Sequence, residues 1–209
     1  MDVSKITIGA LLHDIGKVIY RSATQDNRAH TVSGENFIKE IVDDKDVLEA
    51  IGYHHKAQLK NAELDDNSSA YIVYIADNIA SGADRRGYEE TENEQKRYQK
   101  DLPLESIFNL LNNRNGNQKI NLSTIEKINF PNENAIADES TYNMIFQKIK
   151  QGLQGIHFEK EYENSLLELL EATLSFVPSS TNIEEVADIS LYDHSKITAA
   201  FASCIYLYL

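Results

Sequence analysis

Apolar residues recur at helical spacing along most of this 209-residue chain, and this pattern constrains its fold more than any other feature. Positions three and four residues apart lie on one face of a helix, so the spacing predicts helices that each bury one side. The chain is therefore expected to be mainly α-helical. The expected helices cover residues 4–21, 30–42, 46–53, 70–80, 103–111, 141–153, 159–176 and 193–209, the last with Asp193 as its N-cap.

Strand signals are confined to one short region. Residues 119–122 and 127–130 alternate polar and apolar side chains, which is the pattern of half-buried strands. They predict a small β-hairpin inserted among the helices. The polar stretch 81–101 is expected to form a loop or an exposed helical turn.

The composition is that of a globular protein, with 42% apolar and 25% charged residues. A single cysteine, Cys204, cannot form an internal disulfide, which favours a reducing cytoplasm. Since the chain has neither a signal peptide nor an apolar run of roughly 20 residues, no membrane association is expected. Residues 1–209 are expected to form one domain. They end within an apolar helix without a capping residue, so we expect a longer protein to continue after residue 209.

The formal net charge of −13 argues against a protein that coats duplex DNA, because such proteins gain affinity from clustered Lys and Arg. A solvated acidic surface explains most of the excess negative charge. Divalent cations would offset the charge where a phosphate must bind, so nucleic-acid chemistry stays open.

The adjacent pair His13-Asp14 lies on an otherwise apolar helix. Taken alone, these residues would more often be hydrogen-bonded core or capping residues. Further imidazole and carboxylate groups follow at or near the ends of predicted helices, and their presence favours a metal site. These residues are His30, His54, His55 and Asp77.

Asp77 is the most informative of these residues, because its helix is apolar on nearly every side. An unpaired buried carboxylate costs several kcal/mol or takes up a proton. No Lys or Arg lies within a turn of it, so its partner is expected to be a metal ion or, alternatively, a distant Arg.

The mixture of imidazole and carboxylate ligands suits Mn, Fe, Co or Ni better than Mg, which prefers oxygen ligands. No cysteine takes part, which excludes a structural zinc finger. The sequence therefore predicts a catalytic hydrolytic centre with one or two divalent transition-metal ions.

Residues 11–17, Leu-Leu-His-Asp-Ile-Gly-Lys, resemble the signature of the HD phosphohydrolase superfamily. The later elements follow that superfamily's order: His30 in His-Thr-Val-Ser-Gly-Glu, then His54-His55, then Asp77 in Ala-Asp-Asn-Ile-Ala. The superfamily has another His on a preceding helix, but no His precedes His13 here. Residues 193–200, with His194, resemble that first helix, which implies a circularly permuted HD-type fold.

This permuted order, together with residues 80–86, 103–108 and 188–194, is similar to one group: the N-terminal HD nuclease domain of the large signature subunit of type III-A CRISPR effector complexes. The resemblance implies a metal-dependent nuclease that cleaves single-stranded DNA within an RNA-guided antiviral complex. It also implies CRISPR RNA and other effector subunits as partners. Palm domains that make cyclic oligoadenylate, with a Gly-Gly-Asp-Asp motif, would follow after residue 209 and do not occur in this chain.

The site hypothesis that follows assigns His13, Asp14, Asp77 and His194 to a first metal ion. Asp14 would also bridge to a second ion. The second ion would be held by His30, His54 and His55. Together, the ions would activate water for in-line attack on phosphorus and stabilise the developing charge.

Three cations are candidates for contacting substrate. Lys17, one helical turn after His13, could bind a phosphate oxygen in a catalytic role, or could be an ordinary solvated lysine. Arg85 and Arg86 could contact DNA phosphates, although a solvated pair in a loop is the simpler view. His157 is not accompanied in the sequence by other candidate metal ligands, so it is expected to be structural.

Two other functions compete with the nuclease. One is a nucleotide phosphohydrolase or cyclic-dinucleotide phosphodiesterase on the same metal chemistry. The phosphodiesterases resemble this chain around His54-His55, but they usually have Glu next and a Gly-Tyr-Pro motif, whereas Lys56 follows here and that motif is missing. The other is a mainly structural module of a ribonucleoprotein, and the full set of ligands argues against a degenerate site.

Overall fold

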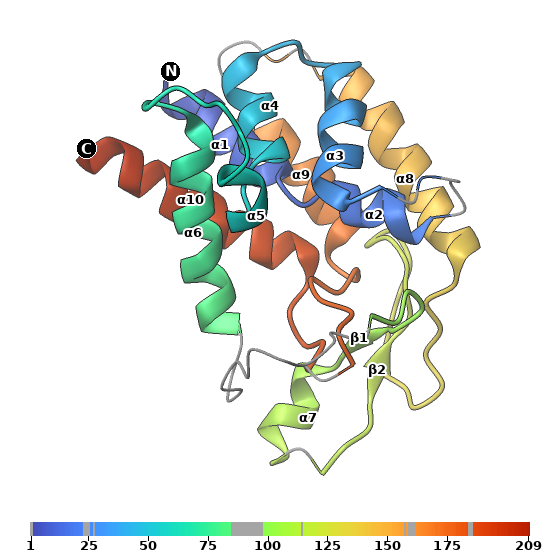
Figure 1. Ribbon diagram of the computed structural model, residues 1–209. Coiled ribbons are helices and arrows are strands. Elements are labelled where there is room, and N and C mark those ends of the chain that lie inside the picture. Colours follow the sequence, from blue (N-terminus) through green and yellow to red (C-terminus); the bar gives the residue numbers. More distant parts are fainter. Residues whose placement is uncertain are drawn as a thin grey trace.

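Helices account for most of the regular structure, as the apolar spacing predicts (Figure 1). The computed structural model describes residues 2–22, 26, 28–84, 98–113, 115–156, 158, 162–183 and 186–209. The mainly α-helical fold class is confirmed. The helices are α1 (Val3–Leu12), α2 (Gly16–Arg21), α3 (His30–Lys39), α4 (Lys45–Gly52), α5 (Lys56–Leu59), α6 (Ser69–Asp84), α7 (Ile107–Leu111), α8 (Glu139–Gln154), α9 (Glu163–Leu174) and α10 (Leu191–Tyr208).

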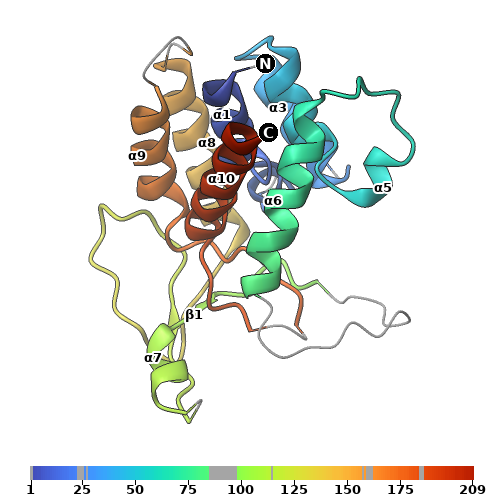
Figure 2. The same ribbon diagram turned by 90° about the vertical axis from the view of Figure 1, so that its left-hand side faces the viewer.

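Helix α1 is the centre of the packing. Ile6, Ala10 and Leu12 are completely buried, because α4, α6, α9 and α10 all contact this helix. The last helix of the chain, α10, thus packs against the first. Figure 2 shows α6 and α10 side by side on one face of the molecule.

The predicted helix 4–21 is wrong in one respect, since it is broken into α1 and α2. At the break, Ile15 N donates to Leu12 O at 3.0 Å, and Lys17 N donates to Asp14 O at 2.9 Å. These bonds span three residues instead of the four of an α-helix. The resulting turn carries His13 and Asp14 and lets α2 pack against α3.

The small β element has a different pairing from the one predicted. β1 (Leu104–Glu105) pairs antiparallel with β2 (Lys119–Ile120), whereas residues 127–130 form no strand. The Asn109 side chain explains this pairing: its amide nitrogen donates to Gln118 O at 2.8 Å, and its oxygen accepts from Gln118 N at 3.0 Å. The sheet and α7 project from the helices at the bottom of Figure 1.

The N-cap of α10 is Ser190 and not Asp193. Ser190 Oγ accepts a hydrogen bond from Asp193 N at 3.0 Å, which is the usual geometry of a capping serine. Residues 189–191, at the start of the helix, pair with residues 177–179. None of the helices in the described parts of the chain is long and apolar enough to cross a membrane.

Candidate metal centre

The structure brings every predicted ligand into one cluster. The ligands come from the turn between α1 and α2, the start of α3, the segment after α4, the middle of α6 and the first turn of α10. Three groups of three ligand residues each have donor atoms that all lie within 4.8 Å of one another. The groups are His30, His54 and His55; His13, Asp77 and His194; and His13, Asp14 and His54.

Asp14 lies between two sets of imidazoles. Its Oδ1 is 3.3 Å from His30 Nε2 and 3.7 Å from His54 Nε2. Its Oδ2 is 3.3 Å from His13 Nε2 and 3.6 Å from His194 Nε2. Since each oxygen faces a different pair, the carboxylate is placed where it can serve two ions.

Asp77 is buried, and its ion-pair partners in the described part of the chain are histidines, with no Arg among them. Oδ1 lies 3.2 Å from His194 Nε2 and 3.8 Å from His13 Nε2. Oδ2 lies 3.7 Å from His55 Nδ1. The carboxylate therefore faces the cluster, where it can serve as a metal ligand.

Backbone carbonyls orient two of the imidazoles. His13 Nδ1 lies 2.7 Å from Ala10 O, and His54 Nδ1 lies 2.8 Å from Ile51 O. Because a carbonyl only accepts, each Nδ1 is the donor, which leaves Nε2 of the neutral ring as the atom that can bind a metal, as in many metal-binding histidines.

Several acceptor atoms of the cluster are buried without a hydrogen-bond partner among the described residues. They are His13 Nε2, His54 Nε2 and Asp14 Oδ1. Leaving a buried acceptor unsatisfied costs about 1–3 kcal/mol, and more for a charged group. Divalent cations bound in the cluster would satisfy these atoms, so the residues present fit divalent metal ions.

The protonation states also suit metal binding. Burial opposes the charge on Asp14, but nearby Lys17 contributes to holding the pKa of that carboxyl well below its usual value. Burial lowers the pKa of His30 and of His54, and it lowers the pKa of His55 to about 4. Near neutral pH these imidazoles are thus uncharged and the carboxylate is ionised, as metal ligands must be.

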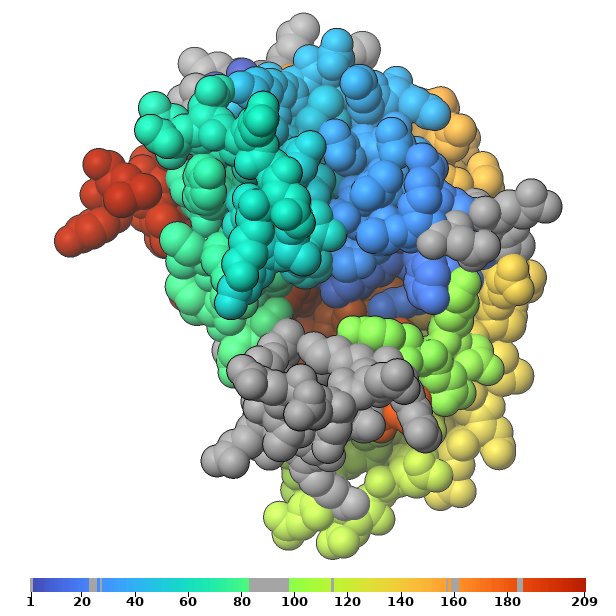
Figure 3. Space-filling view, in the orientation of Figure 1, coloured from blue at the N-terminus to red at the C-terminus, as the bar shows by residue number. Residues whose placement is uncertain are grey.

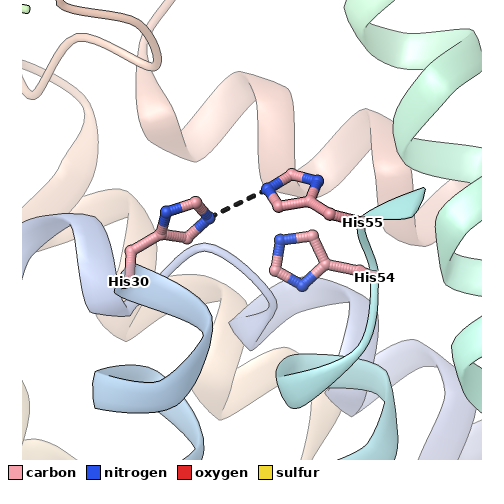
Figure 4. Close-up of side chains that lie close together, drawn as sticks. All are labelled: His30, His54 and His55. Atoms are coloured by element: carbon pink, nitrogen blue, oxygen red, sulfur yellow. Dashed lines mark hydrogen bonds between the residues drawn. The ribbon is translucent and has the colours of Figure 1, made fainter. Parts of the chain in front are cut away.

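The cluster is open on one side. His13 and His54 are completely buried, whereas the side chains of His30 and His55 are 25% and 40% exposed. Figure 4 shows these two rings with their Nε2 atoms facing each other, 3.1 Å apart. In Figure 3 the blue to teal segments border a hollow, and orange to red atoms of the C-terminal third are visible inside it.

Lys17 lies at this site as well, with its side chain 24% exposed. Its Nζ donates to Asp14 Oδ2 at 2.5 Å and to Ser179 O at 3.1 Å. The other predicted substrate contacts, Arg85 and Arg86, lie outside the described residues, as does His157.

Sequence reasoning missed Arg21. This residue is only 4% exposed, and its Nη1 donates to Pro178 O at 2.6 Å. A second cation one helical turn after Lys17 on an apolar helix is the signal that could have pointed to it.

The comparisons with known proteins agree with this geometry. A family model described as "HD domain" matches residues 1–82. A relative from Enterococcus italicus, named "CRISPR system single-strand-specific deoxyribonuclease Cas10/Csm1 (subtype III-A)", is 38% identical over 217 residues, which cover 98% of this chain and 29% of the relative. The chain belongs to the HD domains of the Cas10/Csm1 family.

Solved Csm1 structures share the fold of this Cas10/Csm1 HD domain. A crystal structure of Csm1 from T. onnurineus has a TM-score of 0.71 at 24% identity, covering 97% of this chain and 28% of that one. A Csm1–Csm4 subcomplex of the type III-A CRISPR-Csm interference complex has a TM-score of 0.70 at 22% identity, covering 99% and 28%. The chain thus spans less than a third of the length of the relatives it matches.

Proposed function

We propose that this chain is a metal-dependent nuclease domain that hydrolyses phosphodiester bonds of single-stranded DNA. The observation that carries the proposal is the convergence of five imidazoles and two carboxylates around buried acceptor atoms that have no hydrogen-bond partner among the described residues. The name of the Enterococcus relative, a single-strand-specific deoxyribonuclease, supports the choice of substrate.

The proposed ligand sets follow the geometry of Asp14. One ion would be held on the buried side by Asp14 together with His13, Asp77 and His194, and a second on the open side by Asp14 with His30, His54 and His55. Because both sets include imidazole ligands, Mn, Ni or Co is expected in preference to Mg. Bound there, such ions would supply an activated water and stabilise the charge that develops on the phosphate.

Positively charged side chains of the protein would position the substrate. Lys17, at the open side, can bind a phosphate oxygen through its ammonium group while its carbonyl contact with Ser179 limits its movement. Arg85 and Arg86, which follow α6 in the sequence, would contact phosphates farther along the strand. The buried histidines exclude bulk water from the side opposite the opening.

The biological setting is part of the same proposal. We infer that the domain works in the cytoplasm within a type III-A effector complex, with CRISPR RNA and other subunits as partners. A circularly permuted order of the HD helices fits this setting, with His194 as the ligand that the superfamily carries on its first helix. Synthesis of cyclic oligoadenylate would belong to palm domains outside these 209 residues.

The deciding experiment incubates the purified, metal-stripped protein with single-stranded DNA, duplex DNA and nucleotides, with Mn²⁺ or Ni²⁺ added back. We expect metal-dependent cleavage of the single strand, reduced by more than about 100-fold in the His13→Ala/Asp14→Ala variant. Circular dichroism checks that this variant is folded.

A matched control replaces two exposed acids, Asp65→Ala/Asp66→Ala, and should cleave like the unmodified protein. Full activity in the His13→Ala/Asp14→Ala variant would refute the proposal. Hydrolysis of nucleotides without cleavage of DNA would favour the phosphohydrolase alternative.

A further inference from the structure

Helix α2 presents two cations, one turn apart, to two successive carbonyl groups from the other end of the chain. Lys17 Nζ donates to Ser179 O at 3.1 Å, and Arg21 Nη1 donates to Pro178 O at 2.6 Å. Arg21 is buried and also lies over the Tyr142 ring, 5.9 Å from its centroid. Hydrogen bonds from charged donors are the stronger kind, so the two contacts hold residues 178–179 firmly against α2.

The segment held in this way leads directly to α10. Ser179 N donates to Ile189 O at 2.9 Å, and Leu191 N donates to Val177 O at 2.6 Å. The residue between these bonds, Ser190, caps α10. His194 N then donates to Ser190 O at 3.0 Å, in the first turn of the helix.

A continuous path of hydrogen bonds therefore joins α2 to the last ligand of the cluster. At its other end, Lys17 also donates to Asp14 Oδ2, the oxygen that lies 3.6 Å from His194 Nε2. Contacts with one short helix, α2, thus fix the position of His194 relative to Asp14.

The packing of α10 does not provide this precision by itself. Its buried face consists largely of small side chains such as Ala199 and Ala202. Apolar contacts between smooth helix faces are not directional, whereas hydrogen bonds are. A metal ligand has to be held to within about 0.5 Å of its productive position.

We propose that Lys17 and Arg21 form a clamp on residues 178–179 that sets the position of His194 in the metal centre. Within this clamp, Arg21 is a positioning residue that acts through residues 178–190 and contacts none of the ligands. The inference rests on the proposed metal centre and adds a residue that governs its assembly.

The test is a double-mutant cycle on metal affinity. Arg21→Met keeps the apolar stem and removes the donor, and His194→Ala removes the ligand. Mn²⁺ affinity is measured by titration calorimetry for the unmodified protein, both single variants and the double variant. We expect each single variant to bind Mn²⁺ about 10-fold to 100-fold more weakly.

The double variant separates positioning from general stabilisation. If Arg21 acts through His194, adding Arg21→Met to His194→Ala should weaken Mn²⁺ binding by less than about twofold, because coupled residues are not additive. Arg21→Lys, which keeps a charged donor, should recover part of the affinity. Arg28→Met, at an exposed arginine paired with Asp26, should bind Mn²⁺ normally.

Unchanged Mn²⁺ affinity in a folded Arg21→Met variant, or additive losses in the double variant, would overturn the clamp. Thermal unfolding without metal reports any purely structural effect of Arg21. If Arg21→Met does not fold, Ser190→Ala tests the other end of the path, and here too a normal affinity would overturn the proposal. Failure of the unmodified protein to bind Mn²⁺ would instead refute the metal centre itself.

Discussion

At the scale of single residues, the metal centre depends on a close approach between two backbone segments. Gly16 follows Asp14 by two positions, and a Cβ placed on it would lie 1.8 Å from His30 O. The absence of a side chain therefore lets the turn that carries His13 and Asp14 approach the start of α3, which carries His30. The proposed ligands of the two ions can meet only because this contact is made backbone to backbone.

A substitution tests this close approach. Gly16→Ala should lower the free energy of unfolding by about 3 kcal/mol, because the His30 backbone cannot yield as a flexible side chain could. Gly82→Ala is the matched control, since nothing lies within 4 Å of its would-be Cβ, and it should change stability by no more than about 1 kcal/mol. Urea denaturation measures both, and equal effects would contradict the argument.

At the scale of elements, most of the ligands lie at or near the ends of helices. Helix α4 ends at Gly52, and His54 and His55 follow its C-cap residue, Tyr53. Its start is fixed by Asp44, whose Oδ1 accepts from Asp46 N at 3.0 Å and Val47 N at 3.3 Å, and whose Oδ2 lies 2.8 Å from Lys5 Nζ. The cap thus ties α4 to α1 at the end opposite the metal centre.

The stabilisation provided by this cap should depend on pH. Burial raises the pKa of Asp44, but the contacts with Lys5 and Val47 N outweigh burial, so the folded-state pKa lies below the ordinary value of 3.8. The contribution is then complete above about pH 4 and is lost as the pH falls through the folded-state pKa.

We expect Asp44→Ala to lower the free energy of unfolding by about 1 kcal/mol at pH 6, and by less at pH 2–3. Urea denaturation of metal-free protein across this range gives the comparison. Asp66→Ala, in an exposed loop, should show no such trend. A difference between Asp44→Ala and the unmodified protein that grows toward low pH would contradict the assignment.

At the scale of the whole molecule, the centre joins elements from both ends of the chain. His13 and Asp14 follow the first helix, whereas His194 lies in the last one, about 180 residues later. The centre therefore exists only when α1 and α10 are packed together. Metal binding and folding should be coupled, because the unfolded chain cannot present these ligands at once.

This coupling predicts a large stabilisation by metal. Mn²⁺ or Ni²⁺ at a concentration 100 times its Kd should raise the free energy of unfolding by about 2.7 kcal/mol, and a chelator should reverse the effect. Thermal or chemical denaturation with and without metal measures it. The His13→Ala/Asp14→Ala variant should show almost no shift, and an equal shift in that variant would place the binding elsewhere.

The sequence alone determined the features that depend on short stretches of the chain. Helical periodicity predicted the mainly α-helical class, and side-chain chemistry selected most residues of the cluster, whereas His194 was added by the resemblance to a known family. Both signals are read over a few neighbouring positions. Metal binding by these residues is a proposal that the experiments above test.

Only the tertiary structure decided what depends on distant contacts. The break after Leu12 reflects the approach of Gly16 to α3, and β2 pairs with β1 because Asn109 binds the Gln118 backbone. The role of Arg21 depends on a carbonyl 157 positions away. Periodicity cannot reveal such contacts, because they are fixed by which surfaces meet after the helices pack and not by the spacing of residues along the chain.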